Sequence, residues 1–350
     1  MLNILKRCKN YKNLIGRSEI KSELIKIAQD RDDRFIVFVG SQGTDKEAWA
    51  DALASNLLCE EPGEAGACME CRACRYLENG THPDYLEINP EKDSKNIAIQ
   101  TIRDRVHAEI NILPQLNNVK LWRIDANALQ EGAQNALLKV LEEPPSYAYF
   151  ILTVDDRTKL LPTLRSRARE IKIPAMNRED LNAFLDVHDI NDPKQRNLAI
   201  NFSSGLPQLA LQLAKDEDLQ EERKEIFKWF VEFLRAREVD VLTTCYTFWD
   251  KSKSSMDTNI LFLQSFLRDM VLLKAGTQVD NNNLLNQDMV SYLQKLNQEY
   301  RFSITDLSDA LQTLNEVSKR SKANVNFEIS ICGMMLKLRS NLNINRLSRN

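Results

Sequence analysis

The chain has 350 residues, of which 43% are hydrophobic and 28% are charged, and its formal net charge is −3. These values are typical of a globular protein with about two or three domains, and the slightly acidic balance excludes a globally basic nucleic-acid coat. No apolar run approaches the roughly 18 residues that a membrane helix needs. Residues 1–7 lack a long apolar core, so we expect no export signal and a cytoplasmic protein with reduced thiols.

The first half of the chain alternates short apolar strands with helical patterns, which is typical of an α/β fold with a parallel sheet. We expect strands near residues 35–39, 84–88, 119–124, 147–154 and 170–173. Between them, residues 46–58 and 128–143 repeat apolar side chains at helical spacing. Pro144 and Pro145 end the second of these helices, because a proline nitrogen cannot donate and its ring clashes with the preceding turn.

The strand signals cease after Pro174, and helical patterns follow. We expect helices over 178–187, 193–202, 206–214, 225–236, 259–274, 284–299, 305–320 and 327–342, with a charged connector at 215–224 and a loop at 280–283. The pattern therefore predicts an α/β domain over 1–176, a small helical domain over 177–217 and a helical C-terminal domain over 218–350.

The segment after the first expected strand has the outline of a phosphate-binding loop, which reads G-x-x-x-x-G-K-[ST] between a strand and a helix. Gly40 and Lys46 are in place, but Asp45 stands at the second glycine and Glu47 at the magnesium-binding hydroxyl. Each change puts a carboxylate where a triphosphate and its metal would lie, and like charges repel strongly in a partly buried site. We therefore expect that the chain binds no ATP and that Lys46 forms a salt bridge with one of these acids.

Four of the seven cysteines, Cys59, Cys68, Cys71 and Cys74, lie close together in the sequence. Four thiolates surround a zinc ion tetrahedrally at about 2.3 Å, and two-residue gaps let neighbouring cysteines reach one ion. An iron–sulfur cluster or unmetallated thiols are the alternatives. Because the protein would fill all four ligand positions, we predict a structural zinc site in a module over about residues 59–80.

This cysteine spacing, placed just after the helix of the loop, resembles the bacterial clamp-loader subunits of DNA polymerase III, in the AAA+ superfamily. Other segments are similar to motifs of that family and occur in the family's order, at residues 14–17, 81–84, 134–145, 160–167 and 323–326. The resemblance implies a P-loop AAA+ domain with an inserted zinc module, then a small helical lid domain. An all-α collar domain, through which subunits assemble, would complete the chain.

The family contains an ATP-hydrolysing motor, gamma/tau, and a delta-prime subunit that does not hydrolyse ATP. The motor follows the acid at Asp125 with a glutamate that polarises the attacking water, but Ala126 stands there, so Asp125 is expected to be structural. Many AAA+ ATPases also place an arginine where this chain has Gln208. By contrast, Ser166 and Arg167 are similar to the family's Ser-Arg-Cys motif, whose arginine acts in trans on ATP bound to a neighbouring subunit.

Arg165, Arg167 and Arg169 alternate, and a row of arginines is usually a solvated edge, so only the resemblance favours a catalytic role, and only for Arg167. The resemblance implies a non-motor subunit that binds gamma/tau and delta subunits and helps to load the sliding clamp onto primed DNA. Two alternatives stay open. One is an active gamma/tau-like ATPase with an atypical loop, and the other is a zinc-bearing DNA-binding protein, which the net charge of −3 disfavours.

Overall fold

The computed structural model describes residues 8–90, 94–216, 218–276, 284–321 and 326–344. The chain divides into two compact units, residues 1–212 and 213–350. The finer division into domains over 1–176, 177–217 and 218–350 stays a prediction. The N-terminal segment 1–7, the loop expected at 280–283 and most of the motif at 323–326 lie outside the described residues.

A parallel sheet forms the centre of the first unit, and its described strands follow the order β2–β3–β4–β1–β5. The strands are β1 (Phe35–Val39), β2 (Tyr85–Ile88), β3 (Lys120–Asp125), β4 (Ala148–Val154) and β5 (Arg169–Lys172). Every pairing between neighbours is parallel, so the chain must cross over the sheet between strands. The predicted parallel α/β sheet is confirmed, with each strand end within about one residue of its expected position.

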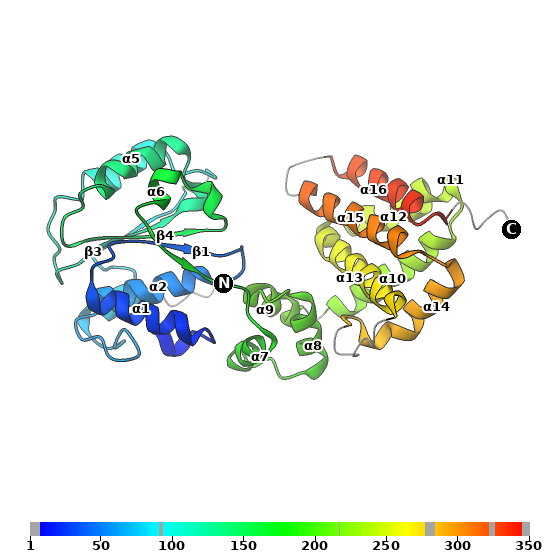
Figure 1. Ribbon diagram of the computed structural model, residues 1–350, viewed down its shortest axis with the longest axis horizontal. Coiled ribbons are helices and arrows are strands. Elements are labelled where there is room, and N and C mark those ends of the chain that lie inside the picture. Colours follow the sequence, from blue (N-terminus) through cyan, green and yellow to red (C-terminus); the bar gives the residue numbers. More distant parts are fainter. Residues whose placement is uncertain (1–7, 91–93, 217, 277–283, 322–325, 345–350) are drawn as a thin grey trace. The chain divides into compact units, whose positions relative to one another are not determined.

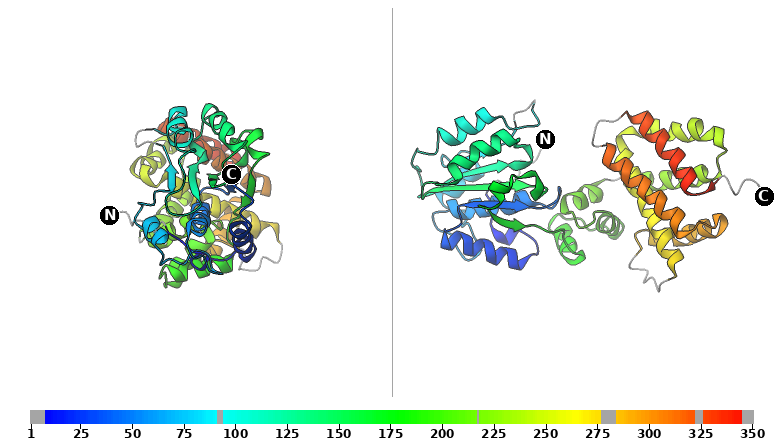
Figure 2. Two further views of the ribbon diagram at one scale, coloured as in Figure 1. Left: turned by 90° about the vertical axis from the view of Figure 1, so that its left-hand side faces the viewer. Right: turned by 45° about the horizontal axis from the view of Figure 1, so that its top comes forward.

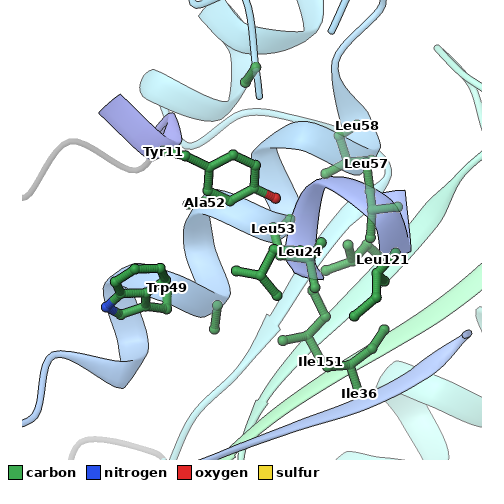
Figure 3. Packing of buried hydrophobic residues seen from close by; sticks show 14 of the residues in the cluster. Tyr11, Leu24, Ile36, Trp49, Ala52, Leu53, Leu57, Leu58, Leu121 and Ile151 are labelled. Carbon is green, nitrogen blue, oxygen red and sulfur yellow. The ribbon is translucent and has the colours of Figure 1, made fainter. Parts of the chain in front are cut away.

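Helices cover both faces of this sheet, and each face has its own apolar core. Figure 1 shows α1 (Ser18–Asp30) and α2 (Lys46–Leu58) on one face, with α5 (Glu131–Leu141) and α6 (Pro162–Arg165) on the other, and the views in Figure 2 agree. Strand side chains alternate between the two faces. The first core therefore takes Ile36, Leu121 and Ile151 from the sheet and packs them on Leu24, Leu53 and Leu57 of the helices (Figure 3). The second core takes Val37, Trp122, Phe150 and Leu152 and packs them on Ala133 and Leu137 of α5.

The carboxyl ends of β1, β3 and β4 lie side by side at one edge of the sheet, where Val39 pairs with Val154 and Asp125 with Thr153. Ligand sites of parallel α/β sheets form beyond this edge. The loop after β1, the turn η3 (Ala126–Ala128) after β3 and the segment after β4 therefore meet there.

Helices α7 (Arg178–Val187), α8 (Pro193–Phe202) and α9 (Pro207–Lys215) follow the sheet, and α9 extends past residue 212, where the first unit ends. Each helix begins within about one residue of its predicted start. Gly205, just before α9, has φ +82°, and its carbonyl accepts a hydrogen bond from the Met176 amide at 2.7 Å. A Cβ at this position would lie only 2.5 Å from the Met176 carbonyl oxygen. Glycine is therefore required where the chain returns toward the sheet domain.

The second unit is helical, as predicted. Its longer helices are α10 (Leu219–Arg235), α13 (Met256–Ala275), α14 (Val290–Tyr300), α15 (Ile304–Ser321) and α16 (Phe327–Asn341), and α11 (Glu238–Asp240) and α12 (Tyr246–Lys251) are shorter. The expected connector at 215–224 was wrong in part, because α10 already begins at Leu219. Leu219 and Arg223 are buried, and the Arg223 guanidinium donates to Asp288 at 2.6 Å, so tertiary contacts extend the helix. Among the described residues, no helix is both long and apolar enough to cross a bilayer.

Candidate functional site

The loop between β1 and α2 keeps the backbone of a phosphate-binding turn. A Cβ on Gly40 would lie 2.7 Å from both the Ile173 carbonyl oxygen and the Thr44 hydroxyl, so this position requires glycine. Asp45 precedes α2 with φ +64°, in the left-handed region that glycine adopts at little cost. Its side chain makes no capping bond to α2. The turn therefore has the shape of a glycine motif but carries a carboxylate.

Lys46 is buried, with 1% of its side chain exposed, and its charge is used within the chain. Its Nζ lies 2.9 Å from Oε1 of Glu47 and 2.8 Å from Oδ1 of Asp155. Burial lowers the pKa of Lys46, but the hydrogen bonds to Asp155 and Glu47 outweigh it and raise that pKa above its ordinary value. The expected salt bridge to a loop acid is present, to Glu47. Asp155 is a second partner that the sequence did not reveal.

Asp45 contacts the small helical segment as well as the loop. Burial raises the pKa of the Asp45 carboxyl, while nearby Lys9 and a hydrogen bond with Gln208 work in the opposite direction. The backbone N–H of Gln208 also donates to the Gly43 carbonyl at 3.4 Å. A neutral residue of α9 therefore lies against the loop at the place where the resemblance leads us to expect an arginine facing phosphate.

Asp125 caps the turn that follows β3. Its Oδ1 accepts hydrogen bonds from the backbone and side-chain nitrogens of Asn127, each at 3.0 Å. Ala126 is 1% exposed and offers no acid or base. Asn127 in turn accepts from the Asp155 amide at 2.9 Å and from Lys159 Nζ at 3.1 Å. These contacts agree with the expectation that Asp125 has a structural role.

Arg167 lies in the turn after α6, and 40% of its side chain is exposed. Its Nη1 donates to the Thr163 carbonyl at 3.0 Å, and its Nη2 donates to Oε1 of Glu142 at 3.3 Å. Ser166 donates to the same Thr163 carbonyl at 3.1 Å. Arg169, two residues later, pairs instead with Glu23. The row of arginines thus divides among different partners.

The four clustered cysteines meet where α2 ends and α3 (Arg72–Glu78) begins. All four sulfurs lie within 4.8 Å of one another. The Cys59–Cys71 and Cys68–Cys74 sulfurs are 3.9 Å and 4.0 Å apart. A tetrahedral ion with bonds of about 2.3 Å would hold its sulfurs about 3.8 Å apart. The spacing therefore fits one metal ion.

The surroundings of these sulfurs also suit thiolates bound to a cation. Backbone amides of Cys68, Cys71 and Cys74 point at the sulfurs of Cys59, Cys68 and Cys71 at 3.3, 3.3 and 3.4 Å. The neighbouring Cys74 thiol, together with burial, raises the pKa of Cys59, and burial raises the pKa of Cys71. Crowded thiols that resist ionising alone would ionise when a cation compensates their charge. The predicted cysteines thus form a group placed to hold a metal ion, compatible with zinc.

Three residues were not predicted as parts of these sites: Asp155, Glu142 and Gln134. Asp155 directly follows the buried strand β4, and ligand sites of parallel sheets form beyond the carboxyl ends of the strands. The strand order is needed to see that this end lies beside the loop after β1. Gln134 is 3% exposed and lies in the segment that carried the family resemblance. Glu142 lies in the same segment, but its contact with Arg167 joins two separate elements and is not visible within that segment.

Two family models match the chain. One, described as DNA polymerase III, delta subunit, matches residues 17–177, and the other, its C-terminal part, matches residues 217–340. The curated relatives that it resembles include proteins named DNA polymerase III subunit delta'. The chain belongs to the clamp-loader delta-prime family.

The relatives within this family differ in how much they share with the chain. The delta' subunit of Pseudomonas aeruginosa is 40% identical over 136 residues, and that of Escherichia coli is 34% identical over 179. These alignments cover 39% and 51% of this chain, but only 41% and 53% of the two relatives. The Bacillus subtilis subunit is 27% identical over 86% of this chain and 89% of its own length. The likeness thus extends through both units.

Proposed function

We propose that this chain is a non-motor, delta-prime-like subunit of a DNA polymerase III clamp loader. In this role it does not hydrolyse ATP. It scaffolds the cytoplasmic complex and offers Arg167, in the Ser166–Arg167 motif, to ATP on a neighbouring gamma/tau subunit while the clamp is loaded onto primed DNA. One contrast supports the proposal: Lys46 is buried against two acids of its own chain, whereas Arg167 is 40% exposed.

The loss of nucleotide binding is argued from charge. A triphosphate at the loop would approach the carboxylates of Asp45, Glu47 and Asp155, and the cation that should attract it already has two partners. At a few ångströms, such like-charge contacts cost on the order of kilocalories per mole in a partly buried site. Ala126 has no side-chain acid or base that could polarise the attacking water. The alternative of an active gamma/tau-like ATPase needs all of these obstacles to be tolerated.

The family suggests the partners of this chain, and its α/β and helical units suggest which part would contact each of them. Delta and gamma/tau subunits would assemble with this chain through the helical residues 218–350, which we propose as its collar domain. The α/β domain would present Arg167 to the neighbouring gamma/tau subunit. The clamp and primed DNA would be reached through the complex.

We also propose that the cysteine group holds a structural zinc ion. The four sulfurs would complete its coordination, so the ion would stabilise the module over about residues 59–80 without taking part in chemistry. Metal analysis of protein purified without added zinc should return about one ion per chain, and Cys71→Ser should reduce this to near zero. Iron with a visible absorption band would favour a cluster instead.

The trans role is tested by reconstituting the complex with Arg167→Ala. Arginine fingers contribute about 10³–10⁵-fold at a single site in related systems, so DNA-stimulated ATP hydrolysis should lose the contribution of the site that this chain faces. Arg169→Ala is the matched control, since Arg169 is an exposed arginine of the same row that pairs with Glu23. Unchanged hydrolysis with Arg167→Ala would exclude the finger role.

The absence of a working nucleotide site is tested on the isolated chain. Titration with labelled ATP and magnesium should give no saturable binding below about 1 mM. Micromolar affinity would overturn this part of the proposal and favour the gamma/tau-like alternative.

A further inference from the structure

The Arg167 guanidinium is held from its own chain by two acceptors on different elements. The Thr163 carbonyl, within α6, accepts from Nη1, and the Glu142 carboxylate, at the end of α5, accepts from Nη2. An arginine has five N–H donors in a planar fork. These two bonds use two donors and leave three for another acceptor.

Glu142 has a position that helix stability does not explain. It is the C-cap residue of α5, and a negative charge at a helix C-terminus interacts unfavourably with the helix dipole. Its side chain is 58% exposed, so burial does not account for it either. Among the residues that the structure describes, the Glu142 carboxylate pairs with Arg167.

The frame that carries this pair is fixed by a buried side chain. Gln134 of α5 donates through Nε2 to the carbonyls of Leu129 and Lys159 at 3.1 and 2.9 Å. Its Oε1 accepts from the Leu161 amide, directly before α6, at 2.8 Å. Leu164 of α6 is fully buried in the core that α5 shares. Helices α5 and α6 are thus tied together, and the Arg167 and Glu142 side chains are exposed on the surface where the two helices end, here called the α5–α6 edge.

We propose that Glu142 is a positioning residue for Arg167. Glu142 orients the Arg167 guanidinium across the α5–α6 edge before a neighbour's phosphate arrives. Arg167 therefore loses fewer side-chain conformations when it binds that phosphate. This inference rests on the proposed trans role of Arg167. It adds a second residue of this chain to the interface, one that acts through the arginine and does not itself touch phosphate.

The test compares Glu142→Gln with Glu143→Gln in the reconstituted complex with gamma/tau and delta subunits. Both variants remove one exposed carboxylate at the same end of α5. Because exposed ion pairs are weak, Glu142→Gln should lower kcat of DNA-stimulated hydrolysis by about 1.5- to 5-fold at the affected site. KM for ATP should not change, since the neighbour's own loop binds the nucleotide. Glu143→Gln should match the wild type in both constants.

A second measurement repeats Glu142→Gln in the Arg167→Ala background, where a positioning residue should have no further effect. If Arg167→Ala alone changes nothing, the proposed trans role of Arg167 fails, and the positioning role fails with it. If Arg167→Ala lowers the rate while Glu142→Gln equals or exceeds the wild type, only the positioning role fails. A Glu142→Gln loss that persists without Arg167 would assign Glu142 to subunit assembly, and the positioning role would again be wrong.

Discussion

The nucleotide loop and the α5–α6 edge both carry a basic residue that the family resemblance links to phosphate, yet the two residues are treated oppositely. Lys46 is 1% exposed and pairs with Glu47 and Asp155. Arg167 is 40% exposed and pairs with an acid, Glu142, that is itself 58% exposed. The first cation serves the chain's own fold, and the second has one weak pair and keeps further N–H donors for an external anion.

The difference lies in the cost of breaking each pair. An exposed ion pair is worth roughly 0–1 kcal/mol, because water and salt replace most of the attraction. Removing one member of a buried pair costs several times as much, because it leaves charge with poor solvation. A phosphate from another subunit can therefore engage Arg167 at little cost, whereas engaging Lys46 would require buried contacts to break.

The largest expected effect comes from changing each cation to the same apolar residue. Lys46→Met should reduce the free energy of unfolding by about 2–3 kcal/mol, because Glu47 loses its partner and Asp155 keeps only the longer contact with Lys159 at 3.6 Å. Arg167→Met should change it by less than about 0.5 kcal/mol. Urea denaturation of the two variants measures this directly, and equal losses would end the distinction between the two cations.

A smaller loss is expected from Gln134→Ala, which tests whether the outward-facing edge depends on an internal frame. The substitution leaves the Leu129 and Lys159 carbonyls and the Leu161 amide without their partner. Unsatisfied buried groups cost about 1–3 kcal/mol, so we expect urea denaturation to show a free energy of unfolding lower by about 2 kcal/mol. Asn135→Ala, at the exposed neighbouring position of α5, is the control and should cost less than about 0.5 kcal/mol. Similar losses for the two variants would mean that the glutamine clamp contributes nothing.

The smallest effect is a gain, from Asp45→Asn. The folded-state pKa of Asp45 is raised by burial, so the folded chain holds this proton more tightly than the unfolded chain does. Asp45 therefore costs no stability below its ordinary pKa of 3.8 and costs progressively more as the pH rises through its folded pKa. Asp45→Asn should stabilise the protein by up to about 1 kcal/mol near pH 7 and by almost nothing near pH 3. A gain of equal size at both pH values would instead reflect the tolerance of asparagine for left-handed backbone.

Much of the fold was readable because the signals were local. The central strands β1 and β4 are nearly continuous apolar runs, and Lys46–Leu58 was predicted with both ends correct. Helix α1 was missed, although Ile20, Leu24 and Ile27 follow helical spacing, because most of its other positions are polar. The start of α10 was also missed, since the pairing of Arg223 with Asp288 is not visible over a short window.

The sites divide in the same way. Three of the four cysteines are separated by two-residue gaps and the Lys46–Glu47 pair joins adjacent residues, so the sequence alone predicted both. The contacts of Lys46 with Asp155 and of Arg167 with Glu142 depend on which strand lies beside which and on how α5 and α6 pack. No spacing rule within one segment carries that information.

Asp45 keeps the left-handed backbone of a glycine turn although it is not glycine. At this loop, therefore, the backbone conformation of the motif is kept although the side chains differ from it. Asp45→Gly combined with Glu47→Thr would rewrite the side chains on a main chain that needs no remodelling. The nucleotide affinity regained by such a variant would measure how far this main chain still supports phosphate recognition once the two carboxylates are gone, a quantity that an intact motor subunit does not let one isolate.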